Sequence, residues 1–106
     1  MTERIRISVA EVDVLANIYF DGAVQSRTLT MKDGKRLTLG VYLPGEYAFD
    51  SHEPESVEIT RGSAEVLMPG DADWRRVAVG ETYDVPPDCT FKVRIRELTE
   101  YICSFL

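Results

Sequence analysis

Turn-forming dipeptides divide this chain into short segments, and this punctuation limits its fold more than any other feature. The dipeptides are Asp33-Gly34, Pro44-Gly45, Pro69-Gly70 and Pro86-Pro87. The runs between them are rich in β-branched, aromatic and leucine residues that alternate with polar ones, which is typical of strands. Strands are therefore predicted at residues 5–9, 22–31, 36–43, 56–61, 64–68, 76–78, 81–85, 91–97 and 101–106. Many short strands separated by turns predict an all-β sandwich or barrel.

Length and composition predict one domain without a membrane segment. A chain of 106 residues with 44% apolar residues can build one core and is too short for two. No apolar run approaches the roughly 20 residues that a membrane helix needs, and no apolar stretch follows the charged N-terminal residues as it would in a signal peptide. Cys89 and Cys103 fit free thiols better than a disulfide framework. We therefore expect a cytoplasmic protein with no membrane partner.

The charge balance argues against nucleic acid as a partner. The formal net charge is −6, and the basic residues are scattered among acidic ones. Binding to a phosphate backbone needs a continuous basic surface, which this sequence does not offer. A small anionic substrate remains possible where a local cluster of donors outweighs the overall repulsion.

Alternation in residues 51–61 predicts which side chains share a face. Residues two apart in a strand point the same way, so the apolar Val57 and Ile59 mark the inward side. Ser51, Glu53 and Glu55 would then lie at the mouth of the interior, although a bend at Pro54 could break this parity. The same pattern in residues 91–96 predicts that Phe91, Val93 and Ile95 are buried while Lys92, Arg94 and Arg96 face water.

An ionised Glu55 at the mouth of an apolar interior needs a partner. Leaving a carboxylate unpaired there costs several kcal/mol, and Arg36 and Arg61 are the natural cations. Two interpretations stay open: a functional carboxylate in a pocket, or a structural ion pair at the barrel rim.

The glycine and proline spacing resembles the two-part motif of the cupin barrels. Gly45 to Gly62 matches the first part and Gly80 to Pro86 the second. In metal-binding cupins the first part carries two histidines and a third follows the second part. Here Ser51 and Glu53 stand at the first two positions, and Phe91 stands roughly at the third. The resemblance therefore implies a jelly-roll-like cupin barrel without the metal site. A metal-dependent cupin enzyme that uses Glu53, Glu55 and the sole histidine, His52, is the rival interpretation.

A longer set of residues makes a family resemblance specific. The matching runs are Phe20 to Val24, Gly34-Lys35-Arg36, Leu39 to Val41, Pro44 to Phe49, Pro54-Glu55, Arg61 to Pro69, Asp73-Trp74, Gly80, Val85-Pro86, Phe91 and the ending Tyr101-Ile102-Cys103. In this order they resemble the bacterial pyrimidine/purine nucleoside phosphorylases, small metal-free cupins. The resemblance covers residues 19–106, taken as a cupin-like domain. Residues 1–18 form an extension whose alternating Ile5, Ile7 and Val9 predict an edge strand that pairs in the sheet or with a partner subunit, so a homodimer is expected.

The resemblance implies phosphorolysis, in which a nucleoside and inorganic phosphate give a free base and ribose 1-phosphate, with phosphate as co-substrate and no cofactor. Such a site needs a phosphate clamp, acceptors for the ribose hydroxyls and a platform for the base. The chemistry assigns Arg36 to phosphate with Arg61 as second choice, Glu55 to the ribose with Ser51 and Glu53 as support, and Tyr47 and Phe91 to the base.

The position of Arg36 raises a structural question. It faces opposite to the apolar row of Leu37, Leu39 and Val41. Either that row packs on a partner while Arg36 enters the pocket, or Arg36 lies outside and the assignment fails. A non-catalytic cupin that binds a small ligand is the remaining alternative, because fold does not fix function.

Overall fold

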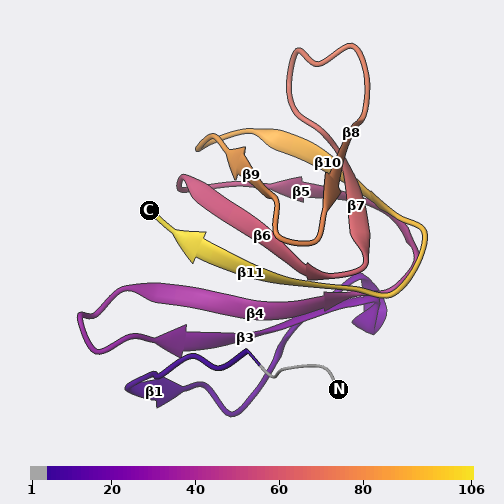
Figure 1. The fold of residues 1–106 in the computed structure, drawn as a ribbon. Helices are drawn as coiled ribbons and strands as arrows, with labels where there is room; N and C mark the ends of the chain where they lie inside the picture. The colour runs from indigo at the N-terminus through magenta and orange to yellow at the C-terminus, as the bar shows by residue number, and fades with distance from the viewer. Residues whose placement is uncertain (1–4) are drawn as a thin grey trace.

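Two antiparallel β-sheets face each other in the computed structural model, which describes residues 5–106 (Figure 1). The larger sheet has the order β1 (Glu11–Val12), β3 (Val24–Thr30), β4 (Arg36–Tyr42), β11 (Thr99–Phe105), β6 (Glu55–Arg61) and β9 (Thr82–Val85), and β2 (Asn17–Tyr19) also pairs with β3. The smaller sheet has the order β5 (Gly45–Asp50), β10 (Thr90–Ile95), β7 (Ser63–Leu67) and β8 (Arg75–Ala78). A 3-10 turn, η1 (Phe20–Gly22), links β2 to β3.

The predicted all-β architecture is confirmed. The strands predicted from residue 22 onward correspond to β3, β4, β6, β7, β8, β9, β10 and β11, with ends shifted by no more than two residues. No helix among residues 5–106 is long and apolar enough to cross a membrane.

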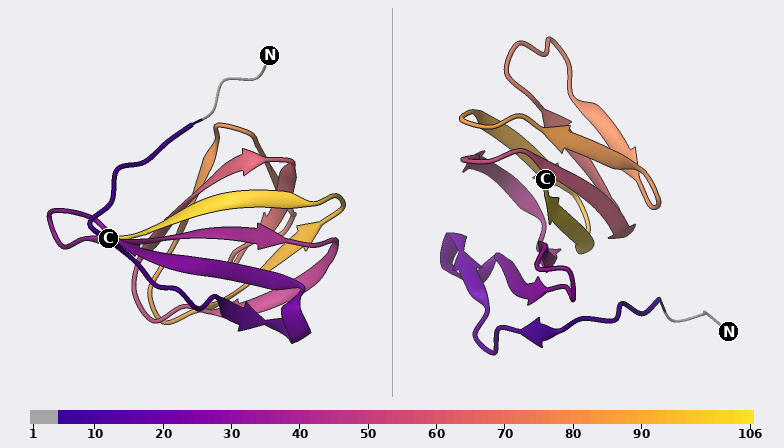
Figure 2. Two further views of the ribbon diagram at one scale, coloured as in Figure 1. Left: turned by 90° about the horizontal axis from the view of Figure 1, so that it is seen from below. Right: turned by 90° about the vertical axis from the view of Figure 1, so that its left-hand side faces the viewer.

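Two strand predictions need correction. Residues 5–9 form no strand; backbone pairing to β3 starts only at the bond from Ala10 N to Thr30 O, followed by the short β1. Ile5 is 81% exposed, so the alternation there marks no buried face. Conversely, β1, β2 and β5 were not predicted, although Tyr47 and Phe49 of β5 alternate with exposed residues. In both views of Figure 2 the indigo segment that leads from residue 5 to β1 lies outside the barrel.

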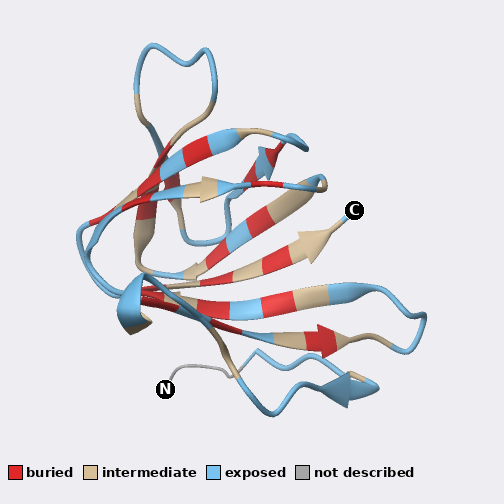
Figure 3. Cartoon of the chain, turned by 180° about the vertical axis from the view of Figure 1, so that it is seen from behind, coloured by how far each residue is buried: buried red, intermediate tan, exposed pale blue. Residues whose placement is uncertain are grey.

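The core lies between the sheets and follows the alternation of the strands. Red and blue bands alternate along β10 in Figure 3, where Phe91, Val93 and Ile95 are buried and Lys92 is exposed. This confirms the predicted buried face of the segment. Burial of apolar side chains at roughly 25 cal/mol per Å² is the main force holding the two sheets together.

Close packing at one glycine shapes the interior. A Cβ atom at Gly40 in β4 would overlap the ring of Tyr101, its partner residue in β11. The absence of a side chain therefore lets the Tyr101 ring lie flat over β4. There it stacks on Tyr42, with ring centroids 4.5 Å apart and an interplanar angle of 27°. Glycine in this strand thus serves close approach, not a turn.

Candidate active site

A cavity of about 280 Å³ opens between the two sheets. Its lining residues on the larger sheet are Tyr19, Ser26, Thr38, Tyr42, Glu55, Val57, Tyr83, Tyr101, Cys103 and Phe105, and on the smaller sheet Phe49, Asp50 and Phe91, with His52 and Glu53 from the β5–β6 connection. The wall on the larger sheet therefore carries hydroxyls, a thiol and a carboxylate among aromatic rings, and the wall on the smaller sheet carries two phenylalanine rings and Asp50. This division lets the cavity hold a ligand with a polar side and a flat apolar side.

Strand register decides which side chains meet in the cavity. Glu55 pairs with Phe105, and Val57 pairs with Cys103, so these two pairs form successive layers on neighbouring strands. On the far side of β11, Cys103 pairs with Thr38. Residues on one face of adjacent strands come within reach both directly and diagonally. The alternation of β4, β6 and β11 thus brings these polar groups to one wall.

Glu55 has an unexpected partner. The thiol of Cys103 donates a hydrogen bond to its Oε1, with a sulfur–oxygen distance of 3.0 Å. Neither Arg36 nor Arg61 pairs with it, so the predicted cation partner of Glu55 was wrong. Among residues 5–106 the thiol is the hydrogen-bond partner found for this carboxylate, and a thiol is a weak donor. Glu55 therefore keeps acceptor capacity for a ligand.

Tyrosine hydroxyls line the deeper part of the cavity. The hydroxyls of Tyr42 and Tyr83 are 3.3 Å apart and share a hydrogen bond. Burial raises the pKa of Tyr42, Tyr83 and Tyr101 well above the ordinary value. These groups therefore stay neutral at physiological pH and act as hydrogen-bond donors and acceptors toward a bound hydroxyl group.

Arg36 lies at the rim of the cavity. It has the same parity in β4 as the buried Thr38, so it faces the interior side while Leu39, 40% exposed, faces outward. Its Nη2 lies 3.1 Å from Glu53 Oε1, and its guanidinium lies over the Phe105 ring at 5.2 Å from the centroid. Arg36 itself does not line the cavity, and its side chain is 54% exposed; it reaches the cavity through its contacts with Glu53 and Phe105.

Three other residues selected from the sequence lie outside the cavity. Ser51 is buried and donates its hydroxyl hydrogen bond to Pro86 O at 2.6 Å, which ties two loops together. Tyr47 is also buried and donates to Leu43 O at 2.6 Å. Arg61 forms an exposed ion pair with Glu100, which does not line the cavity. Of the residues selected from the sequence, Glu53, Glu55 and Phe91 line the cavity, and Arg36 lies beside it in contact with Glu53.

The residues at the cupin metal positions do not fit a metal. Ser51 uses its hydroxyl on backbone carbonyls, and Phe91 offers no ligand atom. Within residues 5–106 no group of three or more His, Cys, Asp or Glu side chains is arranged to hold a metal ion. His52 is exposed and lines the cavity. The residues at these positions therefore support no metal-dependent step.

Sequence reasoning missed most of the polar wall. Three lining residues were not selected from the sequence, because each lies inside a strand whose pattern predicts core packing: Thr38, Tyr83 and Cys103. A signal was present: Tyr101, Cys103 and Phe105 alternate in the last strand and share one face. Recognising that this face lines a cavity requires the neighbouring strands, so the pattern alone was insufficient.

Fold and cavity together define a cupin-type barrel. A solved structure of a cupin superfamily protein from Desulfitobacterium hafniense superposes with a TM-score of 0.64 at 14% identity, covering 78% of this chain and 76% of that one, which supports the fold alone. The fold predicted from the sequence is thereby confirmed.

Sequence comparison identifies the family. The family model described as pyrimidine/purine nucleoside phosphorylase matches residues 14–105. A pyrimidine/purine nucleoside phosphorylase from Sulfurovum sp. is 46% identical over 95 residues, covering 90% of this chain and 92% of that protein. A crystal structure from Acinetobacter sp., a DUF1255 protein of unknown function, has a TM-score of 0.91 at 30% identity over 95% of this chain and 98% of that one. The chain belongs to the pyrimidine/purine nucleoside phosphorylase family.

Proposed function

We propose that the protein is a broad-specificity nucleoside phosphorylase, which converts purine and pyrimidine nucleosides and phosphate to free base and ribose 1-phosphate. The observation that carries the proposal is the cavity itself, which combines the Glu55 carboxylate, the aromatic side chains of Phe49 and Phe91 and the rim cation Arg36 in a member of this family. In this reaction the bond from C1′ to the base nitrogen breaks. A phosphate oxygen forms the new bond to C1′, and the base leaves with the electron pair and takes up a proton.

Arg36 is proposed to bind the phosphate. A guanidinium has five N–H donors, and Glu53 occupies one of them through Nη2. Stacking on Phe105 orients the guanidinium plane at the rim. Two parallel N–H donors suit phosphate oxygens, so the clamp can bind a phosphate that enters from solvent. Glu53 would compete with the phosphate and so limit how tightly the clamp holds it.

Glu55 is proposed to support the sugar. Positive charge develops on the ribose ring as the glycosidic bond breaks, as in glycoside hydrolysis. A carboxylate that lines the cavity and accepts a hydrogen bond from a thiol, a weak donor, can stabilise this charge or accept a hydrogen bond from a ribose hydroxyl. The hydroxyls of Thr38 and Tyr83 on the same wall supply further partners for the sugar.

The aromatic wall is proposed to hold the base. Phe49 and Phe91 of the smaller sheet stack on each other, with centroids 5.6 Å apart, and both line the cavity opposite Glu55. Every nucleobase offers a flat face for such contacts, so stacking tolerates purines and pyrimidines alike. Sugar and phosphate would then lie toward the larger sheet and the base toward the smaller one.

The proposal is tested by incubating the purified protein with uridine, cytidine, adenosine and guanosine, with and without phosphate, and following base release by chromatography. We expect release of free base only with phosphate, accompanied by ribose 1-phosphate. Release that does not depend on phosphate would indicate hydrolysis. No turnover, combined with saturable nucleoside binding, would support the non-catalytic binding module.

A homodimer in the cytoplasm is the proposed setting. A groove of about 600 Å³ on the outer face of the larger sheet is lined by apolar residues of β4 and β11 and by Ile5, Ile7 and Val9. Leu39, at 40% exposure, lies in it, and an apolar groove of this kind is typical of interaction sites. Both cysteines are free, which fits a reducing compartment. Light scattering of the wild type and Leu39→Lys tests the dimer, and a monomer mass for the wild type at micromolar concentration would contradict it.

A further inference from the structure

Cys103 contacts Glu55, the carboxylate on which the proposed reaction depends. The proposed function gives Cys103 itself no role. Its side chain is 4% exposed, lines the cavity and donates to Glu55 Oε1 over 3.0 Å. The other cysteine, Cys89, lies outside the cavity beside Ser51 and Pro86. The chain thus carries one thiol in the candidate site and one matched thiol away from it.

The thiol stays protonated and therefore acts as a donor. Burial raises the pKa of Cys103 far above its ordinary value, and the hydrogen bond to Glu55 and the charge of Glu55 raise it further. The hydroxyl of Thr38 acts in the opposite direction with a smaller effect. At neutral pH the pair is consequently a neutral S–H group beside a carboxylate, not a thiolate. The thiol form is a poor nucleophile, because the thiolate is the reactive form.

The identity of the donor matters for the charge of Glu55. An arginine partner would offset the negative charge, as a fork of strong donors does. A thiol forms a weak hydrogen bond, which orients the carboxylate while leaving its charge available. Glu55 reaches Cys103 diagonally from β6, since Cys103 pairs with Val57 in the ladder. The contact also fixes where the side chain of Glu55 lies on the wall.

We propose that Cys103 is a positioning residue of the site: its thiol holds the Glu55 carboxylate on the cavity wall while leaving that carboxylate negatively charged. The proposal rests on the proposed function, because the orientation of Glu55 matters only if this carboxylate acts on the sugar. Cys103 itself need not touch the reacting atoms.

A double-mutant cycle with Cys103→Ala and Glu55→Gln tests the proposal. We expect Cys103→Ala to lower kcat about tenfold, because a carboxylate that is no longer held in place is misplaced relative to the sugar, with little change in KM for phosphate. In the Glu55→Gln background the same substitution should lower kcat by less than about twofold, because the two residues act as one unit. Cys103→Ser, which retains a donor, should recover most of the activity, and Cys89→Ser should match the wild type.

An infrared measurement supplies a readout that does not depend on activity or on the folding of Cys103→Ala. In Cys89→Ser protein the remaining S–H stretching band belongs to Cys103, and Cys103→Ser confirms the assignment. We expect this band at lower frequency than that of a free thiol, shifting upward in Glu55→Gln as the hydrogen bond to the carboxylate weakens. A band that does not respond to Glu55→Gln would overturn the proposal.

The outcomes separate the two levels of inference. A parent protein without phosphate-dependent cleavage overturns the proposed function and, with it, the role of Cys103. If the wild type cleaves nucleosides but Cys103→Ala lowers kcat by the same factor with and without Glu55→Gln, the positioning role alone is overturned. Wild-type turnover in Cys103→Ala has the same meaning.

Discussion

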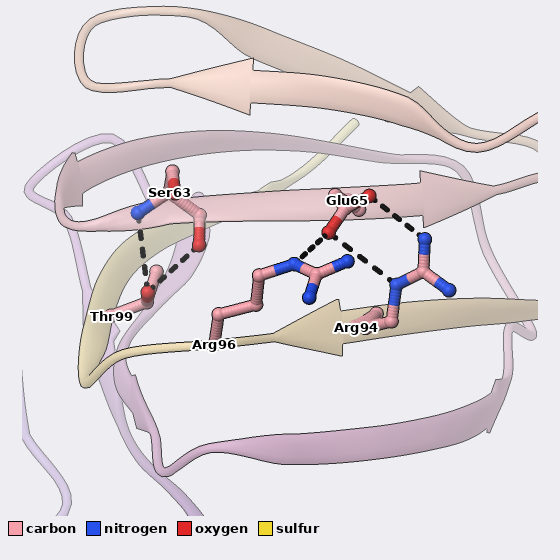
Figure 4. Close-up of polar contacts among 5 residues, drawn as sticks. All are labelled: Ser63, Glu65, Arg94, Arg96 and Thr99. Atoms are coloured by element: carbon pink, nitrogen blue, oxygen red, sulfur yellow. Dashed lines mark hydrogen bonds and ion pairs between the residues drawn. The ribbon is translucent and has the colours of Figure 1, made fainter.

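Two glutamates, one on the outer face of the barrel and one in the cavity, have very different partners. Glu65 on the outer face of the smaller sheet receives a hydrogen bond from Arg94 Nη2 at 2.8 Å and another from Arg96 Nε at 2.7 Å (Figure 4). The hydrogen bond from Arg94, followed by that from Arg96, lowers the pKa of Glu65 to about 2. Within the described part of the chain, the side-chain partner of Glu55 in the cavity is the thiol of Cys103.

This difference shows where the molecule keeps an uncompensated charge. Glu65, whose side chain is 22% exposed, has two arginines. Glu55 is also of intermediate exposure, but it lines the cavity, and no arginine or lysine among residues 5–106 pairs with it. Selection for stability alone would favour a cation beside both half-buried carboxylates. We infer that Glu65 stabilises the pairing of β7 with β10 and that Glu55 is retained for function.

Replacing Glu55 is expected to have the largest effect on activity. Glu55→Gln keeps the size of the side chain but removes the charge, so kcat should fall about 10²–10³-fold, with phosphate affinity unchanged or slightly improved. The melting temperature should stay level or rise, since a costly cavity charge disappears. Steady-state kinetics at saturating phosphate and a thermal melt check both. Full activity in this variant would remove the distinction between the two glutamates.

Replacing Arg36 should act mainly through phosphate. Because its side chain is 54% exposed, Arg36→Ala should cost toward the lower end of about 2–4 kcal/mol in transition-state stabilisation, seen as a raised KM for phosphate. Arg61→Ala is the matched control, as it also removes an arginine paired with a glutamate but lies outside the cavity. Equal losses in both variants would contradict the placement of the phosphate clamp.

Replacing Glu65 should affect stability and leave turnover unchanged. Its lowered pKa means that the folded state gains stability from the ionised form above the ordinary pKa of 4.5, and that this gain disappears as the pH falls through about 2. The difference in unfolding midpoint between wild type and Glu65→Gln should therefore shrink as the pH is lowered from about 4.5 to about 2. Denaturant titrations across this range measure it, with the exposed Glu58→Gln as control. A difference independent of pH would argue against the ion-pair network.

Chelation is expected to have the smallest effect, namely none. Glu53, Glu55 and His52 all line the cavity. A metal ion bound to them would neutralise the negative charge of Glu55, which the proposed mechanism requires. Phosphorolysis should survive prolonged dialysis against a chelator, and elemental analysis should find no stoichiometric metal. Loss of activity that is restored by one transition metal per chain would favour the metal-dependent alternative and change the role of Glu55.

Parts of the site could be predicted from local patterns. Glu53, Glu55 and Phe91 were selected by alternation and motif position, and all three line the cavity. Ser51 and Tyr47 belong to the same motif, but both are buried and their hydroxyls donate hydrogen bonds to backbone carbonyls. A serine or tyrosine in a strand suits either role, and the partner that decides between them comes from distant segments.

The sequence by itself determined the all-β class, the buried faces of strands such as β10, and the family. These follow from the two-residue period of a strand, from turn chemistry and from ordered motifs, all of which are local or collinear. The tertiary structure decided which polar residues meet. Glu55 contacts Cys103, 48 positions away, because β6 and β11 are neighbours in one particular register. A shift of one residue would turn one of these side chains to the other face of the sheet, and no local pattern fixes that register.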